Sequence, residues 1–88
     1  MPFEWDEAKD RSNVAKHGVG FARASQIFAR PIWTVLDDRF DYGEPRFVSV
    51  GRMDNGALVT VVHTPRQAVT RIISARPASP STTVAFLV

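Results

Sequence analysis

The alternation of apolar and polar residues along the chain predicts two helices followed by a run of strands. The first helix is expected from Asp6 to His17, because Asp6 suits the N-cap and Gly18 suits the left-handed position that ends many helices. Its apolar stripe is weak, and the residues at helical spacing are Ala8, Arg11, Ser12 and Ala15, with Val14 beside them.

A second helix follows Gly20 and ends before Pro31, because proline cannot continue a helix. Its apolar residues recur at the spacing of one helical face, and they are Phe21, Ala24, Ile27 and Phe28. Because only Gly18-Val19-Gly20 separates the two helices, they should form a compact pair.

From Ile32 onward the period changes to that of strands. The expected strands are Ile32 to Leu36, Phe47 to Met53, Ala57 to His63 and Ala68 to Arg76. Asp54-Asn55-Gly56 predicts a hairpin turn, and Thr64 to Gln67 a second turn. The strand Ala57 to His63 is apolar on both faces, which indicates a central position in the sheet.

With a strand-like opening at Phe3-Glu4-Trp5, the order is β-α-α-β-β-β-β. This order predicts the α+β class, with two N-terminal helices packed on a mostly antiparallel four- to five-stranded sheet. One domain is expected over residues 1–76. Residues 77–88 form an atypical tail, rich in Pro, Ser and Thr and then apolar, whose prolines oppose a helix. The tail could pack on the sheet, pair with an edge strand of a second chain or remain disordered.

The composition excludes several classes of protein. The chain has 88 residues, of which 44% are hydrophobic, and this is too apolar for intrinsic disorder. No apolar stretch approaches the roughly 20 residues of a membrane span, and acidic residues follow Met1 where a secretory signal would be basic. The absence of cysteine excludes disulfides, thiolate zinc sites and a cysteine nucleophile. We therefore expect a cytoplasmic protein that does not bind membranes.

The charge is unevenly distributed. From Arg46 onward the only acid is Asp54, against five arginines, which are Arg46, Arg52, Arg66, Arg71 and Arg76. An arginine-rich and acid-poor half favours a polyanionic partner, because the planar guanidinium suits phosphate. The alternative, which the composition favours equally, is that these arginines form a basic face that is only solvated and binds no polyanion.

Polar residues that could carry chemistry lie at the ends of the apolar elements. The catalytic candidates are Lys16, His17, His63, Arg71, Ser74 and Arg76, and the RNA-binding candidates are Arg46 and Arg66. A histidine, lysine or glutamate could accept the proton of a ribose 2′-hydroxyl while arginines stabilise the phosphate charge. Such cleavage needs no metal, and no metal or other cofactor is expected, because no metal-ligand spacing is present.

Each candidate also has a structural interpretation. His17 could cap its helix, His63 could be satisfied by a backbone carbonyl, and Arg46 could form a surface ion pair with Glu44. Trp5 and Trp33 are expected in the core, in preference to a role as platforms for base stacking. In a regular strand Arg71 and Arg76 lie on opposite faces, so they can serve one surface only if a bulge intervenes.

The chain resembles the BrnT family of type II toxins at a series of short motifs. They are Phe3-Glu4-Trp5-Asp6, Lys16-His17-Gly18-Val19, Arg46-Phe47, Val61-Val62-His63-Thr64 and Arg71-Ile72-Ile73-Ser74-Ala75-Arg76. The resemblance implies a RelE-like fold and a metal-independent endoribonuclease that arrests translation. It also implies a BrnA-like antitoxin as partner, with operator DNA bound only through that antitoxin. The six catalytic candidates above keep their candidacy on the matching positions.

The chain departs from the family pattern at its end. The family usually continues past Ser-Ala-Arg into a charged helix, whereas Pro77-Ala78-Ser79-Pro80 and an uncharged end stand here. The alternative function is therefore a catalytically weak or inactive toxin fold that only binds an antitoxin and co-represses the operon. Direct DNA binding by this chain alone is disfavoured, because the second helix carries only Arg23 and Arg30.

Overall fold

The computed structural model describes residues 2–82 of the chain. Its elements are β1 (Phe3–Glu4), α1 (Glu7–His17), α2 (Phe21–Ala24), the 3-10 helix η1 (Ser25–Ala29), β2 (Trp33–Asp37), β3 (Arg46–Arg52), β4 (Leu58–Arg66) and β5 (Val69–Pro77). This order confirms the α+β class. The apolar end of the tail, from residue 83, lies outside the described residues. No helix in the described part is long and apolar enough to cross a bilayer.

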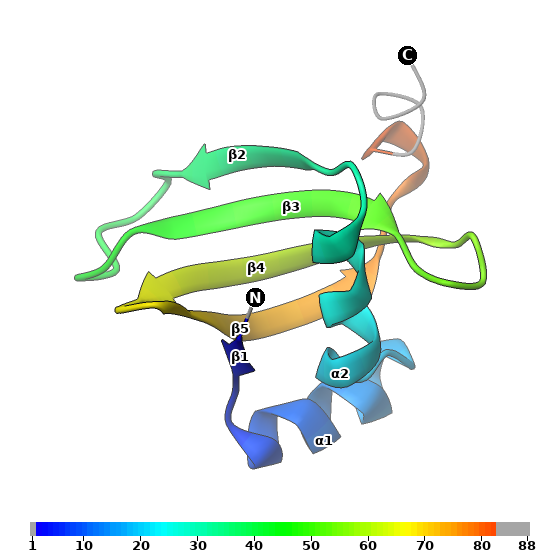
Figure 1. Cartoon of the computed structure of the whole chain (residues 1–88), viewed down its shortest axis with the longest axis horizontal. Helices are drawn as coiled ribbons and strands as arrows, with labels where there is room; N and C mark the ends of the chain where they lie inside the picture. Colours follow the sequence, from blue (N-terminus) through cyan, green and yellow to red (C-terminus); the bar gives the residue numbers. More distant parts are fainter. Residues whose placement is uncertain (1, 83–88) are drawn as a thin grey trace.

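Five strands form one sheet in the order β1-β5-β4-β3-β2 (Figure 1). β1 runs parallel to β5, and every other pair is antiparallel. β4 is the central strand, as its apolar sequence predicts. The expected turn at Thr64 to Gln67 is wrong, because β4 continues to Arg66 and the hairpin turns at Gln67-Ala68. Gln67 adopts the left-handed backbone with φ 55° that so tight a turn requires.

α2 and η1 cover one face of the sheet, and their apolar residues form the core. Phe21, Ala24 and Ile27 are fully buried there, as the spacing predicts. The helix tightens to 3-10 geometry where it meets β3. A Cβ on Gly51 would lie 2.8 Å from Cβ of Ile27, so the helix packs directly on the strand backbone. Asp10 of α1 supplies the cap that Gly20 lacks, since Phe21 N donates to Asp10 Oδ1 at 2.7 Å.

α1 begins and ends as predicted but packs differently. Asp6 accepts hydrogen bonds from Ala8 N and Lys9 N, and Gly18 ends the helix with φ 72°. The expected apolar stripe is wrong, because its members are exposed, namely Ala8, Arg11, Ser12, Val14 and Ala15. The buried residue of α1 is Asn13, which is polar, so the helix is held by hydrogen bonds to the sheet in place of an apolar face.

Asn13 closes the edge of β5. β1 pairs with β5 only at Thr70 and Arg71, which leaves the later part of that edge without a strand partner. There Asn13 Nδ2 donates to Ala75 O at 2.6 Å, and Ala75 N donates to Asn13 Oδ1 at 3.2 Å. Asn13 Nδ2 also donates to Val19 O at 2.8 Å, which ties the loop after α1 to the same point. One side chain thus replaces a missing strand.

The start of the tail also differs from expectation. Residues 80–82 form a helical turn, although the prolines were expected to oppose one. Ser79 caps this turn by accepting a hydrogen bond from Thr82 N at 3.2 Å. Pro80 follows the cap at the first helical position, where its missing N–H and its restricted φ are well tolerated.

Asn13→Ala should destabilise the protein by about 3 kcal/mol, because it leaves the buried N–H and C=O of Ala75 without partners at about 1–3 kcal/mol each. Urea unfolding of the two proteins measures the difference. Ser12→Ala, an exposed neighbour on the same helix, serves as the control and should change stability by less than about 0.5 kcal/mol. Equal stability of Asn13→Ala and the wild-type protein would contradict this role.

Candidate active site

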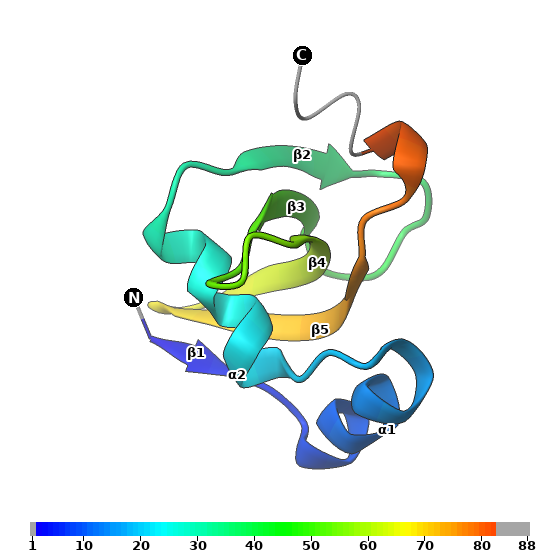
Figure 2. The same ribbon diagram turned by 90° about the vertical axis from the view of Figure 1, so that its right-hand side faces the viewer.

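The sheet face opposite α2 and η1, which we call the open face, carries most of the candidate residues. Figure 2 shows α2 on one side of the sheet, and α1 and the end of the described chain toward the other side. Strand pairing aligns side chains of the open face in rows. One row runs across four strands and comprises Trp33, Val50, Thr60 and Arg76. The next row comprises Val35, Val48, Val62 and Ser74.

A bulge in β5 brings Arg71, Ser74 and Arg76 to this face. Val62 pairs with Ser74, whereas His63 pairs with Ile72, so Ile73 is an extra residue in β5. Ile72 and Ala75 are both buried in the core, although a regular strand would turn them to opposite faces. Their strand neighbours Arg71, Ser74 and Arg76 therefore all face away from the core. The bulge that would allow Arg71 and Arg76 to lie on one surface is therefore present.

A first pocket, the cationic pocket, lies between α1 and the bulge of β5. Its volume is about 210 Å³, and it is lined by Lys9, Ser12, Asn13, Lys16, His17, Ile73 and Ser74. Three of the candidate catalytic residues thus meet here, contributed by the last turn of α1 and by β5. Lys9 and Ser12 were not among the candidates. Ser12 lies one helical turn before Lys16 and Lys9 lies two turns before it, and this spacing could have predicted that they share a face of α1 with Lys16.

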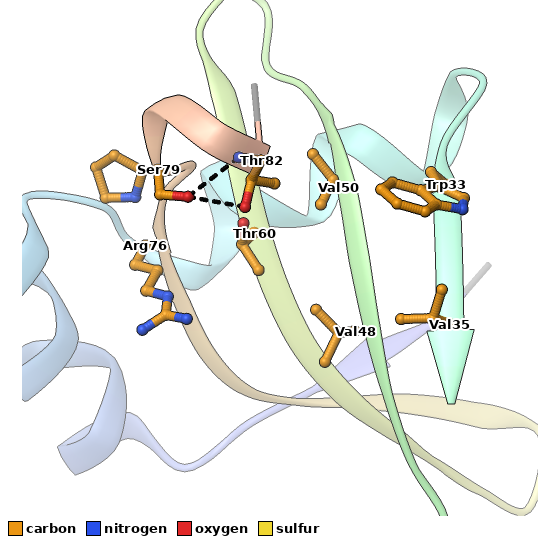
Figure 3. Close-up of a pocket in the computed structure, with 9 residues that line it drawn as sticks. Trp33, Val35, Val48, Val50, Thr60, Arg76, Ser79 and Thr82 are labelled. Carbon is orange, nitrogen blue, oxygen red and sulfur yellow. Dashed lines mark hydrogen bonds between the residues drawn. The ribbon is translucent and has the colours of Figure 1, made fainter. Parts of the chain in front are cut away.

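A second pocket, the apolar pocket, lies beside the first on the open face (Figure 3). Its volume is about 440 Å³, and it is lined by Trp33, Val35, Val48, Val50, Thr60, Arg76, Pro77, Ser79 and Thr82. Trp33 and Arg76 lie at opposite sides, with Val48, Val50 and Thr60 between them. Arg76 is two residues from Ser74 of the cationic pocket on the same face. The two pockets are therefore neighbours along β5.

The cations around these pockets differ in whether a carboxylate neutralises them. Arg71 pairs with Glu4 at 3.5 Å. Within residues 2–82, Lys16, His17 and Arg76 have no salt bridge, and all three are exposed. An unpaired, exposed cation keeps its full attraction for an incoming anion. The open face near α1 is consequently suited to phosphate.

Arg46 and Arg66 lie apart from both pockets. Both contact Glu44 at 3.7 Å, which confirms the expected ion pair of Arg46 and adds a second arginine to it. The guanidinium of Arg46 also lies over the ring of Tyr42, 4.2 Å from its centroid. These arginines are placed by β3 and by the end of β4, at the far end of the open face from Arg76. They do not join the other candidates.

His63 lies on the opposite face of the sheet, in the core. Its Nε2 is 2.7 Å from Ser49 Oγ, and its ring packs edge-on against Phe28 and is stacked with Phe47. Burial lowers the pKa of His63 from its ordinary value of 6.5. The structure does not bring this histidine together with Lys16 or His17. Its polar partner is a serine hydroxyl and not the backbone carbonyl considered above.

The two tryptophans also divide between the faces. Trp5 is packed against the core and contacts Phe21 edge-on, as expected. The core position expected for Trp33 is wrong, because this side chain is 49% exposed on the open face. The physical reason is that β2 is an edge strand and that α2 and η1 cover the other face of the sheet. Among the described residues, no group of three or more His, Asp or Glu is arranged to hold a metal.

Comparisons with known proteins give a family and a similar crystal structure. The family described as "Ribonuclease toxin, BrnT, of type II toxin-antitoxin system" matches residues 5–81. The 1.1 Å crystal structure of the Brucella abortus ribonuclease toxin, BrnT, is 26% identical to this chain, with a TM-score of 0.67. The match covers 90% of this chain and 97% of that one. No curated protein matches the sequence.

The buried His63 predicts a loss of stability in mild acid. Because its pKa is lower in the folded than in the unfolded chain, its contribution is complete above 6.5 and is lost as the pH falls toward the folded-state pKa. Asp37, whose pKa the hydrogen bond from Arg39 lowers to about 2, loses its contribution only below 3.8 and is constant over this range. Urea unfolding at about pH 7.5 and about pH 5 should show the loss.

His63→Gln should remove much of this pH dependence, although it also lowers stability at neutral pH. His17→Gln, which alters an exposed histidine, is the matched control and should keep the dependence of the wild-type protein. A dependence that disappears with His17 and persists without His63 would contradict the assignment.

Proposed function

The chain belongs to the BrnT family of ribonuclease toxins of type II toxin-antitoxin systems, and from this we propose that it cleaves RNA on the open face of its sheet without a metal ion. The scissile phosphate would lie between the cationic pocket and Arg76. The observation that carries this proposal is the meeting of an ammonium, an imidazole and a guanidinium, which form no salt bridge within residues 2–82, with a hydroxyl on one surface. These residues are Lys16, His17, Ser74 and Arg76.

The proposed reaction is the attack of a ribose 2′-oxygen on the adjacent phosphorus. His17 is the proposed proton carrier, because imidazole both accepts and donates protons near neutral pH. Loss of the 2′-hydroxyl proton to a base accompanies formation of the bond between the 2′-oxygen and phosphorus. The bond from phosphorus to the 5′-oxygen breaks, and an acid protonates that oxygen. The products are a 2′,3′-cyclic phosphate and a 5′-hydroxyl.

The neighbouring groups would stabilise the charge that develops on the phosphate. Arg76 offers a planar pair of donors, Lys16 offers an ammonium, and Ser74 can donate a hydrogen bond. Arg71 lies on the same face, four β4 positions or roughly 13 Å from Arg76 along the strand. We therefore assign Arg71, which already pairs with Glu4, to a neighbouring phosphate. His63 has no part in the reaction, because it lies in the core.

Membership of a type II system implies an antitoxin as partner. We propose that this antitoxin is BrnA-like, that it neutralises the toxin by covering the open face, and that the complex alone binds operator DNA. Free toxin would inhibit translation in the cytoplasm by cleaving RNA. The alternative, a weak or inactive toxin fold that only binds the antitoxin, predicts no cleavage by the isolated chain.

Arg76→Ala should lower the rate of RNA cleavage by at least about 100-fold, because it removes a donor to the developing charge. The measurement is cleavage of total RNA by the purified full chain. Arg52→Ala, another exposed arginine of the sheet that lies outside both pockets, should keep the wild-type rate. Undiminished cleavage by a folded Arg76→Ala protein would contradict the proposed site.

Growth of cells that express the chain gives an independent readout of the same variants. Wild-type protein should arrest growth, and co-expression of the neighbouring reading frame should relieve the arrest. Arg76→Ala should not arrest growth. Absence of both arrest and cleavage with the wild-type chain would instead support the inactive binding module.

Cleavage should continue in excess EDTA and should stop when the ribose at the cleaved position is replaced by 2′-deoxyribose. The reason is that cationic side chains of the protein stabilise the charge on the phosphate, so no metal ion is needed, and that the 2′-oxygen is the nucleophile. Mass spectrometry of the fragments should show the cyclic phosphate. Loss of activity in EDTA, restored by a divalent cation, would refute the metal-free mechanism.

A further inference from the structure

We propose that the apolar pocket is a nucleobase subsite, in which Trp33 stacks on the base of a nucleotide next to the phosphate held by Arg76. This inference rests on the proposed function and adds to it a residue that selects and positions the substrate. Trp33 is 49% exposed, and it forms one side of a pocket whose floor includes Val48 and Val50. Neither the core nor the proposed chemistry accounts for a large aromatic side chain at this place.

The position of Trp33 relative to Arg76 suits one segment of single-stranded RNA. Both residues belong to the row that crosses β2, β3, β4 and β5. Three inter-strand spacings of about 4.8 Å separate their backbones by roughly 14 Å. The two side chains face one pocket from its opposite sides (Figure 3). A cation for the phosphate and an aromatic ring for the base are the pair of contacts typical of single-strand recognition.

The floor of the pocket suits the flat face of a base. Val35, Val48 and Val50 present methyl groups, and Thr60 contributes a hydroxyl beside them. A volume of about 440 Å³ lies within the range of pockets that hold small organic groups. Because every base has a π-face, such a surface binds by stacking and tolerates different bases.

The charge of the pocket favours RNA over a protein segment. The described residues that line it include Arg76 and no carboxylate. The cationic pocket, with Lys16 and His17, continues the positive surface along β5. A ligand that combines an aromatic group with a phosphate at a spacing of one nucleotide matches both features. An apolar segment of the antitoxin would match only the valines.

The first experiment measures binding of single-stranded 2′-deoxy oligonucleotides of about eight nucleotides, a length typical of such sites, which cannot be cleaved through a 2′-oxygen. Fluorescence anisotropy with the full chain gives Kd. Trp33→Ala should weaken binding about tenfold, whereas Trp33→Phe should keep most of the affinity, because phenylalanine retains a stacking face. Leu36→Ala is the matched control, because Leu36 is an exposed apolar residue of the same strand on its other face. It should change Kd less than about twofold.

The salt dependence separates stacking from charge. Arg76→Ala should reduce the slope of log K against log salt by about one phosphate contact. Trp33→Ala should lower the affinity at every salt concentration and leave this slope unchanged. A change of slope with Trp33→Ala would mean that the substitution disturbs the charged site, and this would overturn the assignment.

The second experiment removes one base of the oligonucleotide at a time. With the wild-type chain, an abasic nucleotide at one position should cost about tenfold in affinity, the expected loss of one stacked base. With Trp33→Ala the same abasic position should cost nothing further, because the partner of that base is already absent. Equal abasic losses in the two proteins at every position would overturn the subsite.

The outcomes distinguish failure of the subsite from failure of the proposed function. If Arg76→Ala weakens oligonucleotide binding and RNA cleavage while Trp33→Ala changes neither, the subsite is refuted and the ribonuclease site stands. If the wild-type chain neither binds the oligonucleotides nor cleaves RNA, both are refuted. If Trp33→Ala binds oligonucleotides normally and weakens only the complex with the product of the neighbouring reading frame, the pocket is a protein-docking surface and the proposal is overturned.

Discussion

The hydrogen bonds between Asn13 and the backbone of Ala75 are the constraint on which the arrangement of the site depends. They hold α1 against the edge of β5 at the bulge, where no strand pairs with that edge. Because the bulge reverses the alternation of side chains, Ser74 and Arg76 face away from the core beside the last turn of α1. A buried polar residue is costly unless it is fully bonded, and here its bonds supply the partners that a strand edge would otherwise lack. Stability and the geometry of the site are therefore set by the same contact.

The distribution of acidic residues then divides the arginines into two groups. Glu44 forms salt bridges with both Arg46 and Arg66, and Glu4 forms one with Arg71, so these arginines toward one end of the open face are paired. Within residues 2–82, Lys16, His17 and Arg76 form no salt bridge, and the one carboxylate beside the end of α1, that of Asp10, accepts a hydrogen bond from Phe21 N. The arginine-rich composition of the second half of the chain could not reveal this division, because it counts charges without their partners. In such a small domain, the position of a few glutamates decides where an anion binds.

The sequence predicted the elements well and the faces poorly. The cap at Asp6, the stop at Gly18, the hairpin at Asn55-Gly56 and the central β4 were recognisable because each depends on local chemistry. The role of Asn13 and the face that each side chain of β5 takes could not be recognised, because they depend on contacts between residues far apart in the chain. His17 and His63 were both catalytic candidates, yet His17 is exposed and His63 lies in the core. His63 shares the core face with Val59 and Val61, and because both faces of this strand are apolar, the sequence pattern did not show which face is the core.

Within residues 2–82, α2 and η1 lie on one face of the five-stranded sheet. α2 and η1 cover the core face, where Phe21 and Ile27 are fully buried, and the open face keeps Trp33 and Val35 about half exposed. Apolar groups on an open face contribute little to folding and favour unwanted association. Their presence beside unpaired cations is explained if a ligand that is both aromatic and anionic covers them during function. The open face is then available to bind this ligand, because its side chains are not needed to form the core.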